Sequence, residues 1–291
     1  MMLALGTVQF GLSYGITNVV GQTTPDEVAR IFAVARDAGI ELIDTAAAYG
    51  EAELVLGRTL EQGAPFRIVT KTIPLPSEDQ TGVAAVVGGF RCSLQRLNAS
   101  LVHGLLVHRY EDLAGKAGPA LFAALERCRD AGLVERLGVS VYSPEEALVL
   151  AKHYPIDIVQ LPLNVLDQRS AGSGALRQLK DRSIDVHARS IFLQGALLDA
   201  ERTVGRRIAG LAGPLAGFAD FAKVYGLTPI EAAIAFVQSQ PIAAAVVGVT
   251  SASELQDIAR IWSRDVDHTA LPWDQLAVTD LDLIDPRRWR Q

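Results

Sequence analysis

Four polar residues stand at the ends of apolar, β-branched segments of the sequence or in the loop that follows one of them. They are Asp44, Tyr49, Lys71 and His108, and together they suggest proton delivery to an oxygen that gains negative charge. A phenol has a pKa of about 10, and an ammonium about 4 Å away supplies about 4 kcal/mol at an effective dielectric constant of about 20. Lys71 could therefore bring the Tyr49 pKa towards neutrality. Asp44 would keep the buried lysine charged, and His108 would orient the substrate oxygen.

Each residue alone has a simpler interpretation. Asp44 could be a turn or cap residue, Tyr49 a half-buried loop anchor, and Lys71 a solvated strand end. A lone histidine at a strand end is more often structural than catalytic, and His103, at the opposite end of its segment from His108, is assigned to that structural class. The chemistry therefore requires a fold that brings these strand ends together.

Eight short apolar runs predict eight β-strands. They lack in/out alternation, which is typical of strands covered on both faces, and they span residues 3–10, 40–44, 66–71, 101–108, 136–142, 156–162, 184–190 and 242–249. Helix-period segments lie between them, such as 24–39, where Thr24 caps and Pro25 fits the first helical position, and 143–155, which starts with Ser143 and Pro144.

Strict alternation of strands and helices predicts one α/β domain over residues 1–291, a (β/α)8 barrel. An open doubly wound sheet is the alternative, but no GxGxxG motif follows the first strand. Residues 191–241 are too long for one crossover, so we expect a loop and an additional helix there, a suitable place for a lid or phosphate site.

Composition narrows the class of partner. The 291 residues are 49% apolar and 21% charged, with a net charge of -6, which favours neither nucleic acid nor anionic lipid. Cys92 and Cys128 are too few for a disulfide or zinc framework, so no metal site is expected. We find no secretory signal and no apolar run of about 18 residues, and expect a cytoplasmic protein, monomeric or weakly oligomeric.

Residues 39–57, GIELIDTAAAYGEAELVLG, match the pattern G-x-x-x-I-D-T-A-x-x-Y-G-x-x-E-x-x-x-G. At these residues the sequence resembles the aldo/keto reductase family of (β/α)8 oxidoreductases, and the resemblance continues in order through residues 70–71, 105–108, 132–140, 159–167 and 246–255. It implies that Asp44, Tyr49, Lys71 and His108 form the family's catalytic tetrad. Tyr49 would then donate a proton as hydride passes from a reduced nicotinamide to a carbonyl.

The resemblance also implies a nicotinamide cofactor, NADP in the family's usual preference, and assigns residues to each part of it. Ser140 and Gln160 correspond to positions that contact the nicotinamide carboxamide, and Gly6 and Thr7 to positions that contact the ribose. The pyrophosphate positions are Ser190, Phe192, Gln194 and Gly195. The adenosine positions are Gly248, Val249, Thr250, Ser251 and Asp257. A helix start near Ser251 would suit a phosphate. An ordinary helix cap is the alternative there for Ser251 and Ser253.

Three departures from the family pattern concern the cofactor. Val141 stands where many members have asparagine, which removes one carboxamide contact. Arg189 stands where many members stack an aromatic ring on the nicotinamide, and its charge should weaken binding of the oxidised ring. Glu254 stands where an arginine often binds the 2'-phosphate, so NAD is the alternative cofactor.

The chain starts at its first barrel strand, without the hairpin that closes the barrel floor in many members, and ends compactly. Substrate contacts are therefore expected from residues 11–18, including Tyr14, from 74–80, from Arg109 and Tyr110, and from 191–225. These groups suit a small carbonyl or sugar substrate.

Three functions stay open at this point. The leading hypothesis is an NAD(P)H-dependent oxidoreductase that interconverts a carbonyl and an alcohol. A cofactor-binding regulatory barrel without turnover is the second. A Schiff-base aldolase using Lys71 is the third, although it explains neither Tyr49 nor the matches at the cofactor positions.

Overall fold

The computed structural model describes residues 1–60, 64–199, 203–264 and 271–289. Eight parallel strands form a closed barrel in chain order, with the first strand hydrogen-bonded to the eighth. The strands are β1 (Met2–Gly6), β2 (Leu42–Asp44), β3 (Arg67–Lys71), β4 (Val102–Val107), β5 (Val134–Ser140), β6 (Ile158–Pro162), β7 (Asp185–Arg189) and β8 (Ala244–Gly248). The predicted (β/α)8 barrel is confirmed, and every predicted strand is present, seven of them shorter than predicted and β5 shifted by two residues towards the amino terminus.

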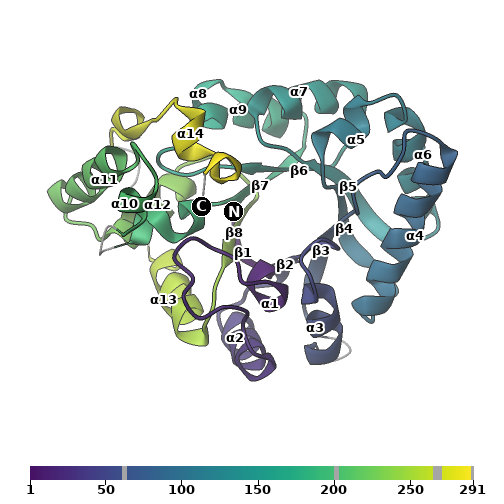
Figure 1. Cartoon of the computed structure of the whole chain (residues 1–291), viewed down its shortest axis with the longest axis horizontal. Helices are drawn as coiled ribbons and strands as arrows, with labels where there is room; N and C mark the ends of the chain where they lie inside the picture. Colours follow the sequence, from purple (N-terminus) through teal and green to yellow (C-terminus); the bar gives the residue numbers. More distant parts are fainter. Residues whose placement is uncertain (61–63, 200–202, 265–270, 290–291) are drawn as a thin grey trace.

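Helices surround the strands as an outer ring (Figure 1). In the first half of the chain they are α1 (Val8–Gly11), α2 (Pro25–Asp37), α3 (Ala52–Thr59), α4 (Gln80–Arg96), α5 (Tyr110–Ala114), α6 (Gly118–Asp130) and α7 (Pro144–His153). In the second half they are α8 (Arg169–Gly172), α9 (Ala175–Asp181), α10 (Thr203–Arg207), α11 (Ala212–Val224), α12 (Pro229–Gln238), α13 (Ala252–Trp262) and α14 (Leu281–Ile284), with 3₁₀ turns η1 (Leu193–Leu198), η2 (Trp273–Leu276) and η3 (Pro286–Arg288).

The predicted helix starts have the side-chain caps that their sequences suggest. Thr24 accepts a hydrogen bond from the Glu27 amide at the start of α2, and Pro25 occupies the first helical position. Ser143 and Glu146 form a reciprocal capping box at α7, again followed by a proline. These caps fix where each strand-to-helix loop ends, and such loops carry the functional residues of a barrel.

The barrel interior is a packed apolar layer. The cluster that fills it comprises Ala4, Leu42, Val69, Leu106, Ile158, Ala244 and Val246. Side chains two residues apart on a strand point to the same face, so the next inward positions after Leu42, Val69 and Leu106 are Asp44, Lys71 and His108. These three residues, called the polar layer below, therefore face the barrel interior at or directly after the carboxyl ends of β2, β3 and β4, each one inward position beyond an apolar residue of its own strand.

The long interval between β7 and β8 holds more structure than predicted. The expected loop and additional helix are present as η1, α10 and α11, before α12 completes the crossover, and residues 200–202 lie outside the described part. Cys92 and Cys128 lie in α4 and α6 as predicted, both as free thiols. Within the described ranges, no helix has both the length and the apolar composition that crossing a membrane would need.

Candidate active site

A buried ion pair connects the ends of β2 and β3. The Lys71 Nζ atom lies 2.8 Å and 2.7 Å from the two Asp44 carboxylate oxygens and 2.9 Å from the Thr45 carbonyl oxygen. The Lys71 side chain is 1% exposed and that of Asp44 6%. Burial acts to lower the Lys71 pKa, but the Asp44 charge and the hydrogen bonds outweigh it and raise that pKa above its ordinary value. Lys71 is therefore an ammonium held in place by Asp44.

Gln160 is the third contact of the Asp44 carboxylate. Its Nε2 donates to Asp44 Oδ1 at 2.7 Å, and the side chain is fully buried in the middle of β6, in register with Ser140. Its Oε1 is buried and has no hydrogen-bond partner among the described residues. Gln160 does not line the cavity described below, whereas Ser140 does. The donor end of Gln160 is therefore engaged with Asp44, and only its acceptor oxygen is available to another group.

Tyr49 lies in the turn between β2 and α3, with the Lys71 Nζ atom 5.0 Å from its ring centroid. Burial raises the Tyr49 pKa above 10, and the Asp44 charge acts in the same direction. Lys71 and Arg189 oppose this rise without cancelling it. The expectation that Lys71 lowers the phenol pKa towards neutrality is therefore wrong for this structure, because it left out burial and the neutralising effect of Asp44 on the ammonium.

His108 follows β4 and meets Tyr49 edge to face, with ring centroids 6.1 Å apart and planes at 82°. Burial, with the nearby positive charges of Lys71 and Arg189, lowers the His108 pKa to about 4. The imidazole is therefore neutral at pH 7, with one N–H donor and one acceptor nitrogen. Its backbone N–H donates to Thr72 Oγ1 at 3.3 Å, which fixes the strand end that carries it.

A cavity of about 730 Å³ opens at the carboxyl ends of the strands. Most of the predicted site residues line it: Gly6, Thr7, Tyr14, Asp44, Tyr49, His108, Ser140, Arg189, Ser190, Phe192, Gln194, Gly195, Gly248, Val249, Thr250, Glu254 and Asp257. The predicted site residues Lys71, Gln160, Ser251 and Arg109 do not. Lys71 and Gln160 lie behind Asp44, and Ser251 is the N-cap of α13, where its hydroxyl accepts from the Glu254 amide at 3.2 Å. The structure therefore agrees with the interpretation of Ser251 as a helix cap.

Arg109 lies outside the cavity, and its predicted substrate contact has no support. The residue precedes α5, its side chain is 52% exposed, and its Nε lies 3.7 Å from Glu111 and 4.0 Å from Asp112. Residues 74–80 and Tyr110 also do not line the cavity. The α5 helix starts directly after Arg109 and directs this segment away from the strand ends. Of the predicted substrate segments, 11–18 and the start of 191–225 do reach the cavity wall.

The loop of residues 12–23 meets the loop after β7 at the cavity wall. Gln194 Nε2 donates to the Tyr14 hydroxyl at 3.0 Å, and Thr17 Oγ1 donates to the Gln194 carbonyl at 3.4 Å. The backbone is left-handed at Leu193 (φ 48°), Gln194 (φ 55°) and Gly195 (φ 90°). A Cβ on Gly195 would come within 2.1 Å of Thr17 Oγ1, so glycine is required there. The Leu193 and Gly195 amides donate to the Ser190 and Phe192 carbonyls at 2.8 and 2.9 Å, so hydrogen bonds within the turn hold this conformation.

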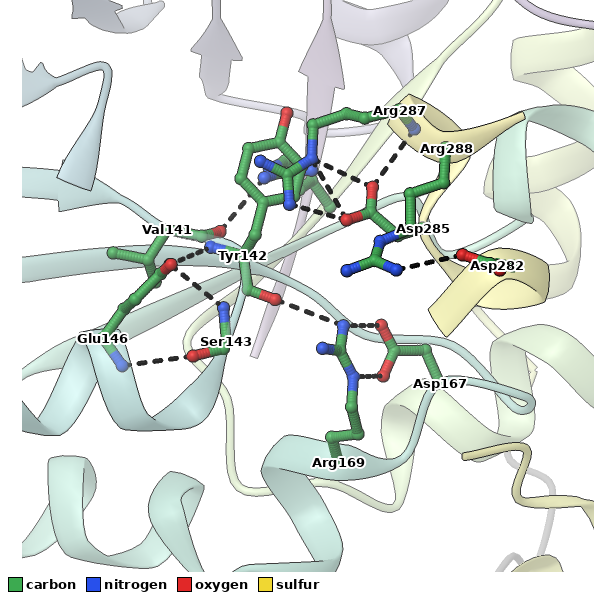
Figure 2. A network of polar contacts seen from close by, with 11 residues as sticks. Val141, Tyr142, Ser143, Glu146, Asp167, Arg169, Asp282, Asp285, Arg287 and Arg288 are labelled. Carbon is green, nitrogen blue, oxygen red and sulfur yellow. Dashed lines mark hydrogen bonds and ion pairs between the residues drawn. The ribbon is translucent and has the colours of Figure 1, made fainter. Parts of the chain in front are cut away.

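Sequence reasoning missed Tyr142, which lines the cavity and lies in contact with two arginines (Figure 2). The Arg189 guanidinium carbon is 4.1 Å and that of Arg287 3.2 Å from the Tyr142 ring centroid. Arg189 also donates to the Val141 carbonyl at 3.0 Å. One face of the Arg189 guanidinium is therefore in use against the Tyr142 ring. The sequence did offer a signal for Tyr142 as a cavity residue, because it lies two residues after Ser140, which ends β5.

The last described segment of the chain supplies one of these arginines. Asp285 holds Arg287 through contacts of 3.0, 3.1 and 2.6 Å, which aims the guanidinium at the Tyr142 ring. The backbone of Tyr142 is fixed separately, since its N–H donates to Glu146 at 2.8 Å and its carbonyl accepts from Arg169 at 3.2 Å (Figure 2). The chain end, although short, thus contacts the cavity wall.

The fold and the site define a (β/α)8 barrel with a tyrosine, a neutral histidine and a buried lysine–aspartate pair at one mouth. The family model described as the aldo/keto reductase family matches residues 2–271, and the chain belongs to this family.

Curated relatives and solved structures agree with this assignment. An aldo-keto reductase from Mycobacterium sp. (strain KMS) is 31% identical over 131 residues, 45% of this chain and 47% of the relative, and one from Mycolicibacterium smegmatis is 30% identical over 162 residues, 52% and 54%. The matched part spans about half the length of these relatives. The holo form of an aldo-keto reductase from Bacillus halodurans has a TM-score of 0.76 at 17% identity, covering 98% of this chain and 94% of that chain. A glycerol dehydrogenase from Gluconobacter oxydans has a TM-score of 0.69 at 21% identity, covering 98% and 92%. These two likenesses show the fold.

Proposed function

We propose that the protein is an NAD(P)H-dependent oxidoreductase that interconverts a carbonyl and an alcohol, with Tyr49 as the proton donor. The observation that carries this proposal is the buried Lys71–Asp44 pair beside Tyr49, at the wall of a cavity large enough for a dinucleotide's reactive end. A structural ion pair alone would not need a cavity in front of it. Perturbed groups in a cleft are typical of a catalytic site.

The residues at the cavity fit a nicotinamide dinucleotide. The buried Oε1 atoms of Gln160 and Gln9 accept no hydrogen bond from the described residues, and Gln9 lines the cavity. A carboxamide brings the N–H donors that such an acceptor lacks, so Ser140 and Gln9 would hold the nicotinamide amide from the cavity wall, which Gln160 does not line. Ser190, Phe192, Gln194 and Gly195, which line the cavity after β7, would hold the pyrophosphate. The reduced nicotinamide, when bound, supplies the hydride.

The remaining chemistry belongs to the side chains of the protein. With its pKa raised by burial, Tyr49 stays protonated across neutral pH and releases its proton only to a strongly basic oxygen. The Lys71 ammonium stabilises the phenolate that this transfer leaves, and Asp44 keeps the ammonium in place. The neutral His108 donates a hydrogen bond to the same substrate oxygen and orients it. In the oxidative direction the same groups accept the proton.

The aldolase alternative loses support. A Schiff base requires a neutral amine. Lys71 contacts both Asp44 oxygens and the Thr45 carbonyl, and its pKa is raised, so its nitrogen is neither free nor deprotonated.

The proposal predicts cofactor-dependent turnover with a small carbonyl substrate. Purified protein should oxidise NADH or NADPH, followed at 340 nm, with at least one member of a panel of aldehydes, ketones and aldoses, and the matching alcohols should reduce the oxidised cofactor. Calorimetric binding of the cofactor is measured in parallel. Tight cofactor binding without turnover in either direction would favour the regulatory barrel, and absence of both would reject the proposal.

The chain end should influence substrate affinity through Tyr142. We expect Arg287→Ala to raise KM for the carbonyl substrate by about two- to fivefold with little change in kcat, because an exposed cation–π contact is worth about 0.5–1 kcal/mol. Arg288→Ala is the matched control, since Arg288 lies in the same turn but pairs with Asp282 at 2.9 Å. Steady-state kinetics of both variants decide the matter. Equal KM values for the two would exclude a specific role for Arg287.

A further inference from the structure

Carboxylates gather at the end of the cavity that borders α13. Glu254 and Asp257 line the cavity there, and the carboxylate of Glu27, from α2, lies against the same turn. The Ala252 amide and the Arg30 side chain donate hydrogen bonds to Glu27 and hold the pKa of its carboxyl below the usual range, so it is ionised at neutral pH. Both helices therefore bring negative charge to one corner of the cavity.

Three backbone amides at the start of α13 already have protein acceptors. The Thr250 amide donates to Glu254 Oε2 at 2.7 Å, the Ala252 amide to Glu27 Oε1 at 2.7 Å, and the Glu254 amide to the Ser251 hydroxyl at 3.2 Å. Free amides at a helix start are what attract a phosphate. Here carboxylates and a hydroxyl occupy the positions that phosphate oxygens would take.

Positive charge does not compensate for these carboxylates inside the cavity. Arg30 is bound to Glu27 at 2.8 Å and Arg260 to Asp257 at 3.3 Å, and neither arginine lines the cavity. Among the described residues that line it, the basic side chains are Arg189 and His108, both at the Tyr49 end. The two ends of the cavity therefore differ in charge, with the α13 end acidic.

We propose that this corner of the cavity selects NAD(H) over NADP(H). The inference rests on the proposed function and on the assignment of the α13 end of the cavity to the adenosine half of the cofactor. A ribose 2'-hydroxyl can donate a hydrogen bond to a carboxylate, and acidic residues accept this hydrogen bond in other dinucleotide sites. A 2'-phosphate at the same place meets the carboxylates of Glu254 and Asp257 instead. The acidic corner thus reverses the NADP preference that family resemblance alone implies.

The selectivity is measured as binding, independently of turnover. Isothermal titration of the purified protein with NADH and with NADPH should give a Kd lower for NADH by about tenfold or more, the size expected for one or two like-charge contacts at an exposed site. The ratio should shrink as salt is raised from about 0.05 M to about 0.5 M, because exposed charges are screened. NADPH binding as tightly as NADH would overturn the inference and leave the proposed function intact. Failure of both to bind would instead remove the proposed function.

Single substitutions of the acidic residues test which side chains disfavour NADPH. Glu254→Gln keeps an acceptor oxygen for the Thr250 amide and removes the charge, so the NADPH Kd should fall by about three- to tenfold while the NADH Kd changes by less than about threefold. Glu27→Gln, which keeps the acceptor for Ala252, should act in the same direction. The matched control is Glu111→Gln, a first-turn glutamate of α5 that does not line the cavity.

Two outcomes of this variant series count against the inference. One is an NADPH Kd unchanged in both Glu254→Gln and Glu27→Gln. The other is an equal gain in Glu111→Gln, which would assign the effect to the net charge of the protein. Thermal denaturation of each variant checks that the fold is retained. Titration with ADP and 2',5'-ADP repeats the comparison without the nicotinamide end, and the wild type should prefer ADP.

Discussion

Tyr49→Phe should lower the rate of carbonyl reduction by about 10²- to 10⁴-fold, the usual contribution of a positioned proton donor. The substitution removes one hydroxyl and keeps the ring that packs edge to face on His108 and beside Lys71. Burying a phenylalanine there also avoids the burial of a polar hydroxyl, so the fold should be retained. Single-turnover measurement of the oxidation of bound reduced cofactor reports the chemical step directly.

Cofactor binding separates loss of chemistry from loss of structure. The calorimetric Kd for the cofactor should change by less than about twofold in Tyr49→Phe, since the cofactor contacts are elsewhere. Tyr110→Phe is the control for removing a tyrosine hydroxyl, because Tyr110 lies outside the cavity at the start of α5. A Tyr49→Phe enzyme that reduces carbonyls at the wild-type rate, with chemistry rate-limiting, would show that another group donates the proton.

Lys71→Met should lower the free energy of unfolding by about 3–5 kcal/mol, because it leaves the buried Asp44 carboxylate without its cation. The volume of the side chain is nearly kept, so the effect reports the charge and not a cavity. Turnover should fall as well, since the phenolate at Tyr49 loses its stabilising ammonium. Urea denaturation of wild type and variant, followed by circular dichroism, measures the difference.

The double variant Lys71→Met/Asp44→Asn is the matched control. It removes both charges while the asparagine can still accept from Gln160 Nε2, so most of the lost stability should return and the activity should not. A loss below about 1 kcal/mol in Lys71→Met would contradict the buried ion pair. So would a double variant no more stable than Lys71→Met alone.

The fold could be predicted because its signals are local. Apolar β-branched runs mark strands covered on both faces, and residues such as Thr24, Pro25 and Ser143 mark helix starts through contacts a few residues away. The polar layer was also predictable, since Asp44, Lys71 and His108 all end strands and strand ends meet at one mouth of a barrel. Arg109 lies outside the cavity, and the sequence analysis did not recognise that α5 starts directly after it.

Contacts between distant parts of the chain could not be predicted. Glu27 reaches the Ala252 amide across 225 residues of sequence, and Arg287 reaches Tyr142 from the chain end. No period or motif encodes such a pair. The predicted direction of the Tyr49 pKa shift was wrong for a related reason, because the burial that raises this pKa is a property of the assembled barrel. Gln160 was placed on the correct strand but lies in its middle, and its contact with Asp44 depends on a rotamer that sequence does not specify.

The apolar interior and the proposed catalytic ion pair occupy neighbouring positions of the same strands. Leu42 and Val69 belong to the apolar interior, whereas Asp44 and Lys71, each two residues further on, form an ion pair that apolar side chains of similar volume would often replace with a gain in stability. Selection for a more stable barrel would favour apolar side chains at Asp44 and Lys71, whereas selection for the proposed activity would keep the charged ones. Stabilising substitutions in this protein should be sought below the polar layer and on the outer helices.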